Sequence, residues 1–298
     1  MKYYVPELKL AALSPPQTQA MDKFGGLPWG LPAARWPHCA ICKRSMALIA
    51  QFFHHEQRLD LGAPGRCLFV FMCSTPESPC GTETFDPASG TNAGFVLEPH
   101  ELDSGGLTWP PDAQASWPIW SVQCCGYLGP GKYGGKVWIN VEARVTGWRE
   151  QEDGIDSGLA KSFRDYDGYW NLPEGVRMNM YAGSKLGGAP CWLQGPPDHQ
   201  AGECRAQFAG YLSFPPPLPS ADEIGCTVTV GHRDLRRCEP KVRRFDVANE
   251  ICAVSVPDVA RPEGSWGCGS ANYGNGIAYV LLQPNGAQPP KCAFLWQC

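Results

Sequence analysis

The fold is decided by residues 23–29, Lys-Phe-Gly-Gly-Leu-Pro-Trp, because a closely similar stretch, Lys-Leu-Gly-Gly-Ala-Pro-Cys-Trp, recurs at residues 185–192. Each copy is followed by a glutamine within an apolar run, Gln51 after the first and Gln207 after the second. A glycine-led apolar run completes each copy, at residues 65–73 and 276–283. Three matched features in the same order predict an internal duplication.

The composition narrows the fold class around this repeat. The chain of 298 residues holds 34 glycines and 29 prolines, so few windows can carry a long helix, and coiled coils and helical bundles are excluded. The glycines follow no triplet repeat, which excludes collagen. Hydrophobic residues make up 43% of the chain, enough for a folded core. The net charge of −4 argues against a protein that coats nucleic acid.

Runs rich in β-branched and aromatic residues predict most of the regular structure. These expected strands are 67–73, 136–145, 226–230, 278–283 and 292–298. Helix signals are short, at residues 158–166 and 220–225. We therefore expect an α+β fold of two duplicated, mostly antiparallel halves with few short helices. The acidic segment 150–158 places the boundary near residue 160, which gives halves of 1–160 and 161–298, the second with a long insertion.

Cysteine usage bears on the cellular compartment. The fifteen cysteines are an odd number, so they cannot all pair with one another within the chain. Residues 1–17 contain no apolar stretch of the length found in signal peptides, and the strongest apolar runs are too short to cross a membrane. We therefore expect a reducing cytoplasm, in which thiols stay free or bind metal, and no membrane partner.

Two cysteine pairs carry the strongest chemical signal. Cys39 and Cys42 lie in a proline-flanked turn, and Cys73 and Cys80 bracket a polar loop at the end of an expected strand. A strand, turn and strand between the pairs would return Cys73 to Cys42, and four thiolates from two short loops suit tetrahedral Zn²⁺. The alternative is that all four are reduced thiols of the core. Cys67 would lie about 20 Å from Cys73 along one strand face, so it is expected in the core.

Other motifs give no catalytic site. The His-Glu pairs that begin at His55 and His100 lack the second histidine of a zinc-protease helix. The glycine-rich stretch 126–134 precedes an expected strand, whereas phosphate binding needs a helix N-terminus, so a hairpin loop is predicted. No cysteine has the spacing to a histidine that would identify a thiol nucleophile. The motif scan favours binding over catalysis.

Two further segments leave alternatives open. The basic stretch 232–244 is either a docking site for an acidic partner or a solvated loop. The stretch 266–276, rich in glycine, asparagine and aromatic residues, is either a binding loop or a tight turn before the last strands.

Taken together, these motifs resemble the YwqG-like family of bacterial proteins, and also the related eukaryotic programmed-cell-death-protein-two family of ribosomal-protein chaperones. The resemblance is carried by 23–29, 36–51 and 67–80 in the first half, and by 185–192, 270–282 and 294–298 in the second. It leaves 81–180 and 215–262 uncovered. The resemblance implies a duplicated, mostly antiparallel fold without established catalysis. The four cysteines of the predicted zinc site match cysteine positions of the chaperone-like pattern.

The resemblance and the motif scan together predict a non-enzymatic, cytoplasmic protein-binding module. The first expectation is an immunity protein that neutralises a polymorphic toxin, and the second is a dedicated chaperone for a basic client protein. The acidic balance favours either, because nuclease toxins and ribosomal proteins are often basic. The rival class is a metal- or thiol-dependent hydrolase that uses the cysteine cluster. No nucleic-acid partner is expected, and the sequence sets neither the partner's identity nor the oligomeric state.

Overall fold

The computed structural model describes residues 1–11, 17–73, 80, 83–103, 105–111, 120–122, 142–197, 202–214, 228–230, 266–269 and 276–298. Three sequence expectations lie outside these ranges: the helix at 220–225, the glycine-rich loop at 126–134 and the basic stretch 232–244.

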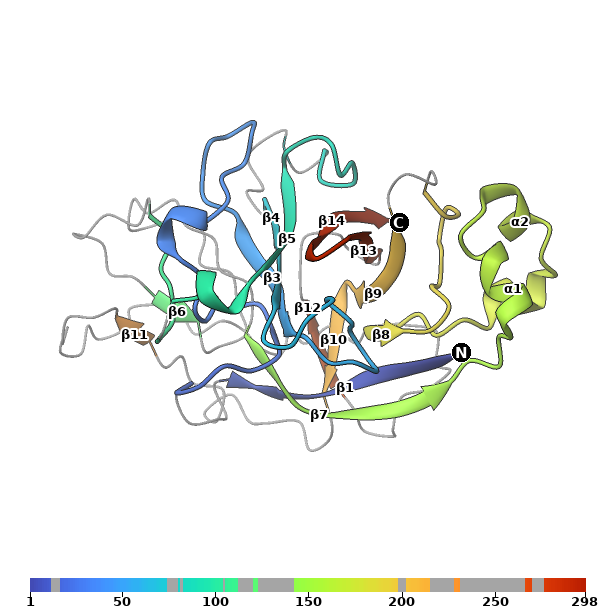
Figure 1. Cartoon of the computed structure of the whole chain (residues 1–298), viewed down its shortest axis with the longest axis horizontal. Coiled ribbons are helices and arrows are strands. Elements are labelled where there is room, and N and C mark those ends of the chain that lie inside the picture. Colours follow the sequence, from blue (N-terminus) through green and yellow to red (C-terminus); the bar gives the residue numbers. More distant parts are fainter. Residues whose placement is uncertain are drawn as a thin grey trace.

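One antiparallel sheet of ten strands dominates the described part of the chain (Figure 1). In spatial order its strands are β14 (Gln288–Gln297), β13 (Ile277–Asn285), β9 (Glu203–Ala209), β8 (Lys185–Gly187), β1 (Lys2–Leu10), β7 (Ala143–Glu152), β2 (Lys23–Phe24), β3 (Ala47–Phe53), β4 (Cys67–Met72) and β5 (Asn92–Leu97). Every neighbouring pair runs antiparallel. The expected antiparallel character is therefore confirmed.

The remaining described elements are short. Two small antiparallel sheets pair β10 (Tyr211–Phe214) with β12 (Trp266–Gly269), and β6 (Trp120–Val122) with β11 (Val228–Val230). The helices are α1 (Ser157–Ser162), α2 (Tyr166–Trp170) and α3 (Glu174–Met178), with 3-10 turns η2 (Ala33–Arg35) and η4 (Pro99–Glu101). The expectation of few short helices holds for the described residues.

The predicted elements agree with the structure in kind, with differences at their ends. The runs 67–73, 278–283 and 292–298 form β4, β13 and β14. The helix expected at 158–166 is instead two helices. Asp156 caps α1 by accepting from the backbone N–H groups of Gly158 and Leu159, and Asp165 starts α2 by accepting from Gly168. A side chain that caps a helix N-terminus also interrupts the helix before it, so the run is broken at Asp165. Of the run 136–145, only its end is described, where Ala143 opens β7.

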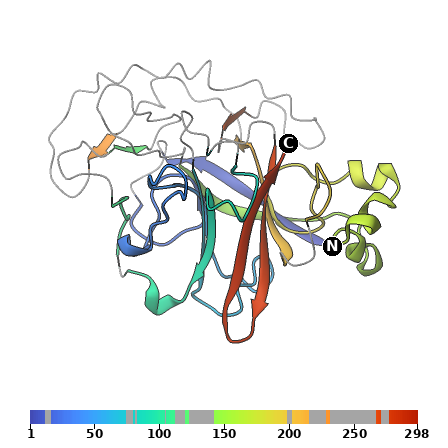
Figure 2. The same ribbon diagram turned by 90° about the horizontal axis from the view of Figure 1, so that it is seen from above.

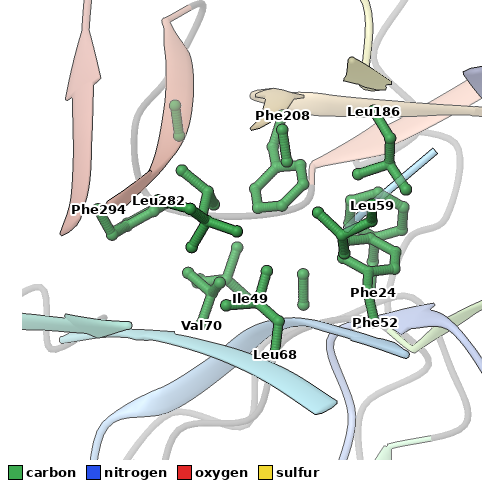
Figure 3. Packing of buried hydrophobic residues seen from close by; sticks show 14 of the residues in the cluster. Phe24, Ile49, Phe52, Leu59, Leu68, Val70, Leu186, Phe208, Leu282 and Phe294 are labelled. Carbon is green, nitrogen blue, oxygen red and sulfur yellow. The ribbon is translucent and has the colours of Figure 1, made fainter. Parts of the chain in front are cut away.

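The sheet curls until its two edge strands face one another (Figure 2). A Cβ atom added to Gly94 of β5 would lie 2.4 Å from the Cys292 Sγ of β14, so this approach of the edges requires glycine. The enclosed core joins both ends of the sheet (Figure 3). Phe24 packs edge-on against Phe52 and Phe208, with ring centroids 5.2 Å and 5.4 Å away. The curvature therefore buries one continuous apolar interior.

A buried arginine fixes the turn between β13 and β14. Arg66, 4% exposed, donates from Nη2 to the Ala287 carbonyl at 2.7 Å and to Glu98 Oε1 at 2.6 Å. Its Nη1 donates to the Leu61 carbonyl at 2.9 Å. Because a guanidinium donates from several N–H groups in a fixed plane, one side chain joins the far hairpin to the strands of the N-terminal region.

The two Gly-Gly pairs take the same backbone shape. Gly25 and Gly26 have φ values of 60° and 68°, and Gly187 and Gly188 have 70° and 68°. This left-handed region is open to glycine and costly for other residues. The second glycine of each pair also has no space for a side chain. A Cβ on Gly26 would lie 2.5 Å from Glu142 Oε2, and a Cβ on Gly188 would lie 2.7 Å from Tyr3 Cβ.

The lysine that opens each motif is buried and folds back onto its own turn. Lys23 is 0% exposed and Lys185 1% exposed. Lys23 Nζ donates to the Leu27 carbonyl and to Gln17 Oε1, the latter at 2.8 Å. Lys185 Nζ donates to the Ala189 carbonyl at 2.6 Å. Each ammonium thus donates a hydrogen bond to the carbonyl four residues ahead, and this bond holds the Gly-Gly turn closed.

The glutamine that follows each motif holds the end of the same turn. Gln51 pairs with Lys23 across β2 and β3, and Gln207 pairs with Lys185 across β8 and β9. Gln51 Oε1 accepts from the Trp29 N–H at 2.8 Å, and Gln207 Oε1 accepts from the Cys191 N–H at 2.8 Å. The lysine, the glycine pair and the glutamine therefore make one local device that occurs twice.

The strand order is the same when read outward from the central pair β1 and β7. On one side β2, β3, β4 and β5 follow β7, and on the other β8, β9, β13 and β14 follow β1. The expected boundary at residue 160 lies within α1, and β1 before it pairs with β8 after it. The division of the chain into units 1–160 and 161–298 stays a prediction.

Replacing the second glycine of either pair with alanine should destabilise the protein. Gly26→Ala and Gly188→Ala combine backbone strain with a steric overlap, so we expect each to lower the free energy of unfolding by roughly 2–4 kcal/mol. Gly286→Ala is the matched control, because Gly286 has φ 62° but open space around its Cβ position. It should lose about 1 kcal/mol. Urea unfolding measures all three, and equal losses would contradict the account.

The buried ammonium of Lys185 should make stability depend on pH. Burial lowers the pKa of Lys185 to about 8 from 10.5. Below pH 8 the group is charged in both states; between pH 8 and 10.5 the unfolded chain keeps the proton that the native protein has lost. The native state of wild type should therefore gain stability relative to Lys185→Met as pH rises through this window, by at most about 1.4 kcal/mol per pH unit.

The stability of wild type is compared with that of Lys185→Met at each pH, because other buried groups make the stability of both proteins fall as the pH rises. Burial raises the pKa of Cys204 and of Cys292 to about 12, so both thiols favour unfolding as pH rises above 9.0. Both variants keep these thiols, and Lys161→Met, at an exposed position, provides the control that should follow wild type. A stability difference between wild type and Lys185→Met that is flat from pH 7 to 10 would contradict burial of the charge.

Candidate metal centre

The four predicted cysteines meet in the structure. The sulfur atoms of Cys39, Cys42, Cys73 and Cys80 all lie within 4.8 Å of one another. Cys42 Sγ lies 3.7 Å from Cys73 Sγ, and Cys73 Sγ lies 3.3 Å from Cys80 Sγ. Three of the four side chains are buried and Cys42 is half-buried. The predicted grouping of these residues is therefore confirmed.

The spacing of the sulfurs fits a tetrahedral metal ion. Four thiolates that bind one Zn²⁺ at about 2.3 Å lie roughly 3.8 Å apart. The separation of Cys73 and Cys80, 3.3 Å, is below this value and no separation exceeds 4.8 Å, so small side-chain movements suffice to reach it. Four protein ligands complete a tetrahedron, which is the arrangement of structural sites. The cluster is compatible with a structural metal ion.

The first pair is presented by a tight turn in which backbone groups bond across the cysteines. The Cys39 N–H donates to the Arg44 carbonyl at 2.9 Å, and the Lys43 N–H donates to the Cys39 carbonyl at 2.9 Å. Lys43 has φ 60°, the single non-glycine residue with positive φ among the described residues. This strained conformation completes the reversal of the chain, so both sulfurs reach the same side.

Backbone N–H groups around the turn favour negative charge on its sulfurs. Burial raises the pKa of Cys39, and hydrogen bonds from the N–H groups of Cys42 and Ile41 oppose that rise. Burial also acts on Cys42, but hydrogen bonds from the Arg44 N–H and from the thiols of Cys39 and Cys73 outweigh it and lower the pKa of Cys42. Because thiolates are the metal-binding form, the lowered pKa of Cys42 favours the state that a metal ion would need.

The second pair is held by the loop that precedes β5. Cys73 directly follows β4, and its N–H donates to the Thr91 carbonyl at 2.8 Å. The Ala40 N–H donates to the Gly90 carbonyl at 2.8 Å, which joins this loop to the first turn. A Cβ on Gly90 would lie 2.7 Å from the Ala40 Cβ, so glycine is required for the approach. The two pairs therefore meet through backbone contacts as well as through their sulfurs.

The cluster lies on an apolar core of its own. Trp36, Met46 and Phe71 belong to the buried group that also contains Cys39, Cys73 and Cys80. Trp36 packs edge-on against Phe71, with ring centroids 5.5 Å apart, and its Nε1 donates to the Met46 carbonyl at 3.0 Å. This support fixes the position of the loops and excludes water from one side of the sulfurs.

Other cysteines stay apart from the cluster. Cys67 is fully buried in β4, as expected, and burial raises its pKa well above the ordinary value. Cys292 is partly buried against the main core. Among the cysteines outside the described residues are Cys124, Cys125, Cys226 and Cys252. Among the described residues, a single group has metal-binding geometry.

Sequence reasoning identified the four clustered cysteines but missed two supporting positions. Lys43 at positive φ has no sequence signal, because lysine is not typical of that conformation. Gly90 had one: it lies between Ser89 and Thr91, in a run of residues that form turns. The contact of Gly90 with Ala40 required the two loops to be placed in space.

Comparisons with known proteins leave the family open. No family model matches the chain, and no curated protein matches it significantly. The YwqG-like resemblance stays a prediction. Within the described residues, none of the helices has both the length and the apolar character needed to span a membrane.

Loss of one ligand should remove the response to metal. Wild type treated with chelator and then given Zn²⁺ should gain thermal stability, because ligand binding to the native state is folding energy. Cys42→Ser should lose most of this gain. Cys67→Ser, which places a hydroxyl in the core, should be less stable than wild type yet keep the gain. The three melting curves, with and without Zn²⁺, distinguish ligation from packing, and an unchanged gain in Cys42→Ser would contradict ligation.

Proposed function

We propose that this chain is a non-enzymatic protein-binding module whose N-terminal region is held by one structural Zn²⁺ ion on Cys39, Cys42, Cys73 and Cys80. The observation that carries the proposal is the convergence of four protein sulfurs within 4.8 Å. A site closed by four thiolates leaves no position for water or substrate, whereas catalytic zinc sites keep one open. The site would therefore stabilise the fold rather than act on a substrate.

We propose zinc as the ion because of the chemistry of the four cysteine side chains. Thiolates are soft ligands, and a tetrahedral set of four sulfurs is typical of Zn²⁺ or of iron. The apolar surroundings and the backbone N–H groups near Cys39 and Cys42 favour a compact, charge-compensated site. A reducing cytoplasm, the proposed location, would keep these thiols reduced and available to the metal.

We also propose that the sheet arose by duplication. The support is the repeated device of lysine, glycine pair and glutamine, together with the matching order of four strands on each side of the central pair. Descent of both halves from one ancestral unit explains the shared hydrogen-bond pattern and the shared strand order together, whereas chance would have to produce each of them separately. The cysteine cluster then belongs to one unit alone, as expected of a feature added after duplication.

The proposed biological role is that of an immunity protein against a polymorphic toxin. The net charge of −4 supports a basic partner, since complementary charge steers association and sets specificity. A dedicated chaperone for a basic client is the second candidate, supported by the same charge. A metal- or thiol-dependent hydrolase is the rival class, and it would need an open metal position or an exposed reactive thiol.

The metal content of purified protein tests the zinc proposal. We expect close to one zinc per chain, and no iron, by elemental analysis of protein purified under reducing conditions without chelator. Cys67→Ser should retain the metal and Cys42→Ser should lose it. Less than about 0.2 zinc per chain in the wild type would contradict the zinc site and would indicate that the four cysteines are reduced thiols of the core.

A binding experiment tests the proposed role. The product of a neighbouring toxin gene, purified and mixed with this chain, should give a stable complex of fixed stoichiometry by light scattering after size exclusion. Chelation of zinc should weaken the complex only as far as it unfolds the N-terminal region. Multiple turnovers of a small molecule, abolished by substitution of one cysteine or histidine, would contradict the proposal and favour the hydrolase.

A further inference from the structure

We propose that Cys42 is a site of reversible oxidation by hydroperoxides, and that its sulfur then forms a disulfide bond with Cys73. This inference rests on the proposed structural zinc site and adds a chemical regulation to it. A disulfide bond removes two of the four thiolates that would hold the ion, so oxidation releases the metal. The stability of the N-terminal region thereby comes to depend on the concentration of peroxide.

Cys42 is the member of the cysteine cluster that solvent reaches. Its side chain is half-buried, whereas the side chains of the other three cysteines are at most 1% exposed. The residues on either side of it, Ile41 and Lys43, are exposed. A hydroperoxide is a small molecule that arrives from water, so it meets the Cys42 sulfur first. Exposure and thiolate character together decide which cysteine of a protein is oxidised.

Cys73 is placed to form the bond with the oxidised sulfur. Its Sγ lies 3.7 Å from Cys42 Sγ. Because the sulfurs of a disulfide bond lie about 2.0 Å apart, these two atoms need to approach by roughly 1.7 Å. Cys39, which shares a turn with Cys42, is the competing partner. A bond to Cys73 joins the two cysteine pairs to one another, whereas a bond to Cys39 stays within the first pair.

The backbone keeps the sulfurs together whether or not a metal ion is bound. The Ala40 N–H donates to the Gly90 carbonyl and the Cys73 N–H donates to the Thr91 carbonyl, both at 2.8 Å. These bonds hold the loop before β5 against the residues on both sides of the cluster. A sulfenic acid at Cys42 therefore has a second sulfur beside it, and disulfide formation protects it from further oxidation to the irreversible sulfinic acid.

The reaction takes two electrons from sulfur and gives them to one hydroperoxide. The Cys42 thiolate attacks a peroxide oxygen, the O–O bond breaks, and Cys42 becomes a sulfenic acid while the leaving oxygen takes up a proton. The Cys73 thiolate then attacks the Cys42 sulfur. The S–S bond forms, the S–O bond breaks, and the hydroxide that leaves is protonated to water. A dithiol reductant reverses the oxidation by thiol–disulfide exchange and is itself oxidised to a disulfide.

Disulfide mapping of the wild-type protein tests the bond. Reduced protein, freed of reductant, is treated with one equivalent of hydrogen peroxide, its remaining thiols are alkylated, and its peptides are identified by mass spectrometry. Cleavage after Glu77 separates Cys73 from Cys80, and fragmentation of the peptides distinguishes Cys39 from Cys42. We expect a bond between Cys42 and Cys73, release of zinc in proportion to it, and reversal of the bond by dithiothreitol. A bond between Cys39 and Cys42 instead would overturn the assignment of Cys73.

Cys298 is the internal control for reactivity. It is exposed, whereas Cys42 is half-buried, and it lies outside the cluster. If exposure alone decided the rate, Cys298 would react first. We expect Cys42 to lose its free thiol about tenfold faster or more at limiting peroxide. Equal loss at the two positions, or faster loss at Cys298, would overturn Cys42 as the preferred site of oxidation.

Cys73→Ser tests the second step of the reaction. Without the Cys73 thiol, we expect the sulfenic acid at Cys42 to persist and to give several-fold more dimedone adduct than in wild type. Cys67→Ser is the matched control, because Cys67 is buried in β4 outside the cluster, and this variant should form the bond as wild type does. Equal adduct in the two variants would overturn the role of Cys73. Melting curves check that both variants fold, and the mapping of wild type needs neither of them.

The outcomes separate this inference from the zinc proposal. Protein that holds zinc and forms no bond between Cys42 and Cys73 overturns the inference and leaves the zinc site in place. Protein that forms the bond and holds no zinc before oxidation supports the oxidation site and overturns the zinc site. Protein that does neither overturns both.

Discussion

A buried lysine ammonium has lost its hydrating water and needs oxygen acceptors inside the protein. The arrangement of the sheet depends on how two buried lysines obtain these acceptors. Lys23 and Lys185 each reach the carbonyl four residues ahead, Leu27 and Ala189. That reach closes only if the chain turns through two left-handed residues, which requires glycine. The turns in turn place Gln51 and Gln207 opposite the lysines and set the register of the strands that follow.

The curvature of the sheet has consequences at both ends of the molecule. It brings β5 against β14 at Gly94 and closes one core. The β3–β4 pair then returns Cys73 to the turn that carries Cys39 and Cys42, where four sulfurs meet. At the other end the chain leaves β7 for the helices α1 to α3, where Tyr166 and Trp170 stay exposed.

Much of this arrangement could be predicted from the sequence, because the deciding signals are local. Strands rich in β-branched residues, the repeated glycine pair and the spacing of Cys39, Cys42, Cys73 and Cys80 are all readable in short windows. The break between α1 and α2 at Asp165 was missed because a helix pattern was favoured over a capping residue. The pairing of β1 with β8 and the approach of Gly94 to Cys292 could not be predicted, since both join residues far apart in sequence. The exposure of Trp170 likewise depends on what covers α2 in space.

We propose that the four sulfurs are ligands of one metal ion rather than neighbouring thiols of the core. X-ray absorption at the zinc edge on the purified protein measures this directly, because it reports the identity and distance of the atoms around the metal. We expect a single shell of four sulfurs at about 2.3 Å from zinc. A shell containing nitrogen or oxygen ligands, or the absence of bound zinc in protein that is fully folded, would contradict it.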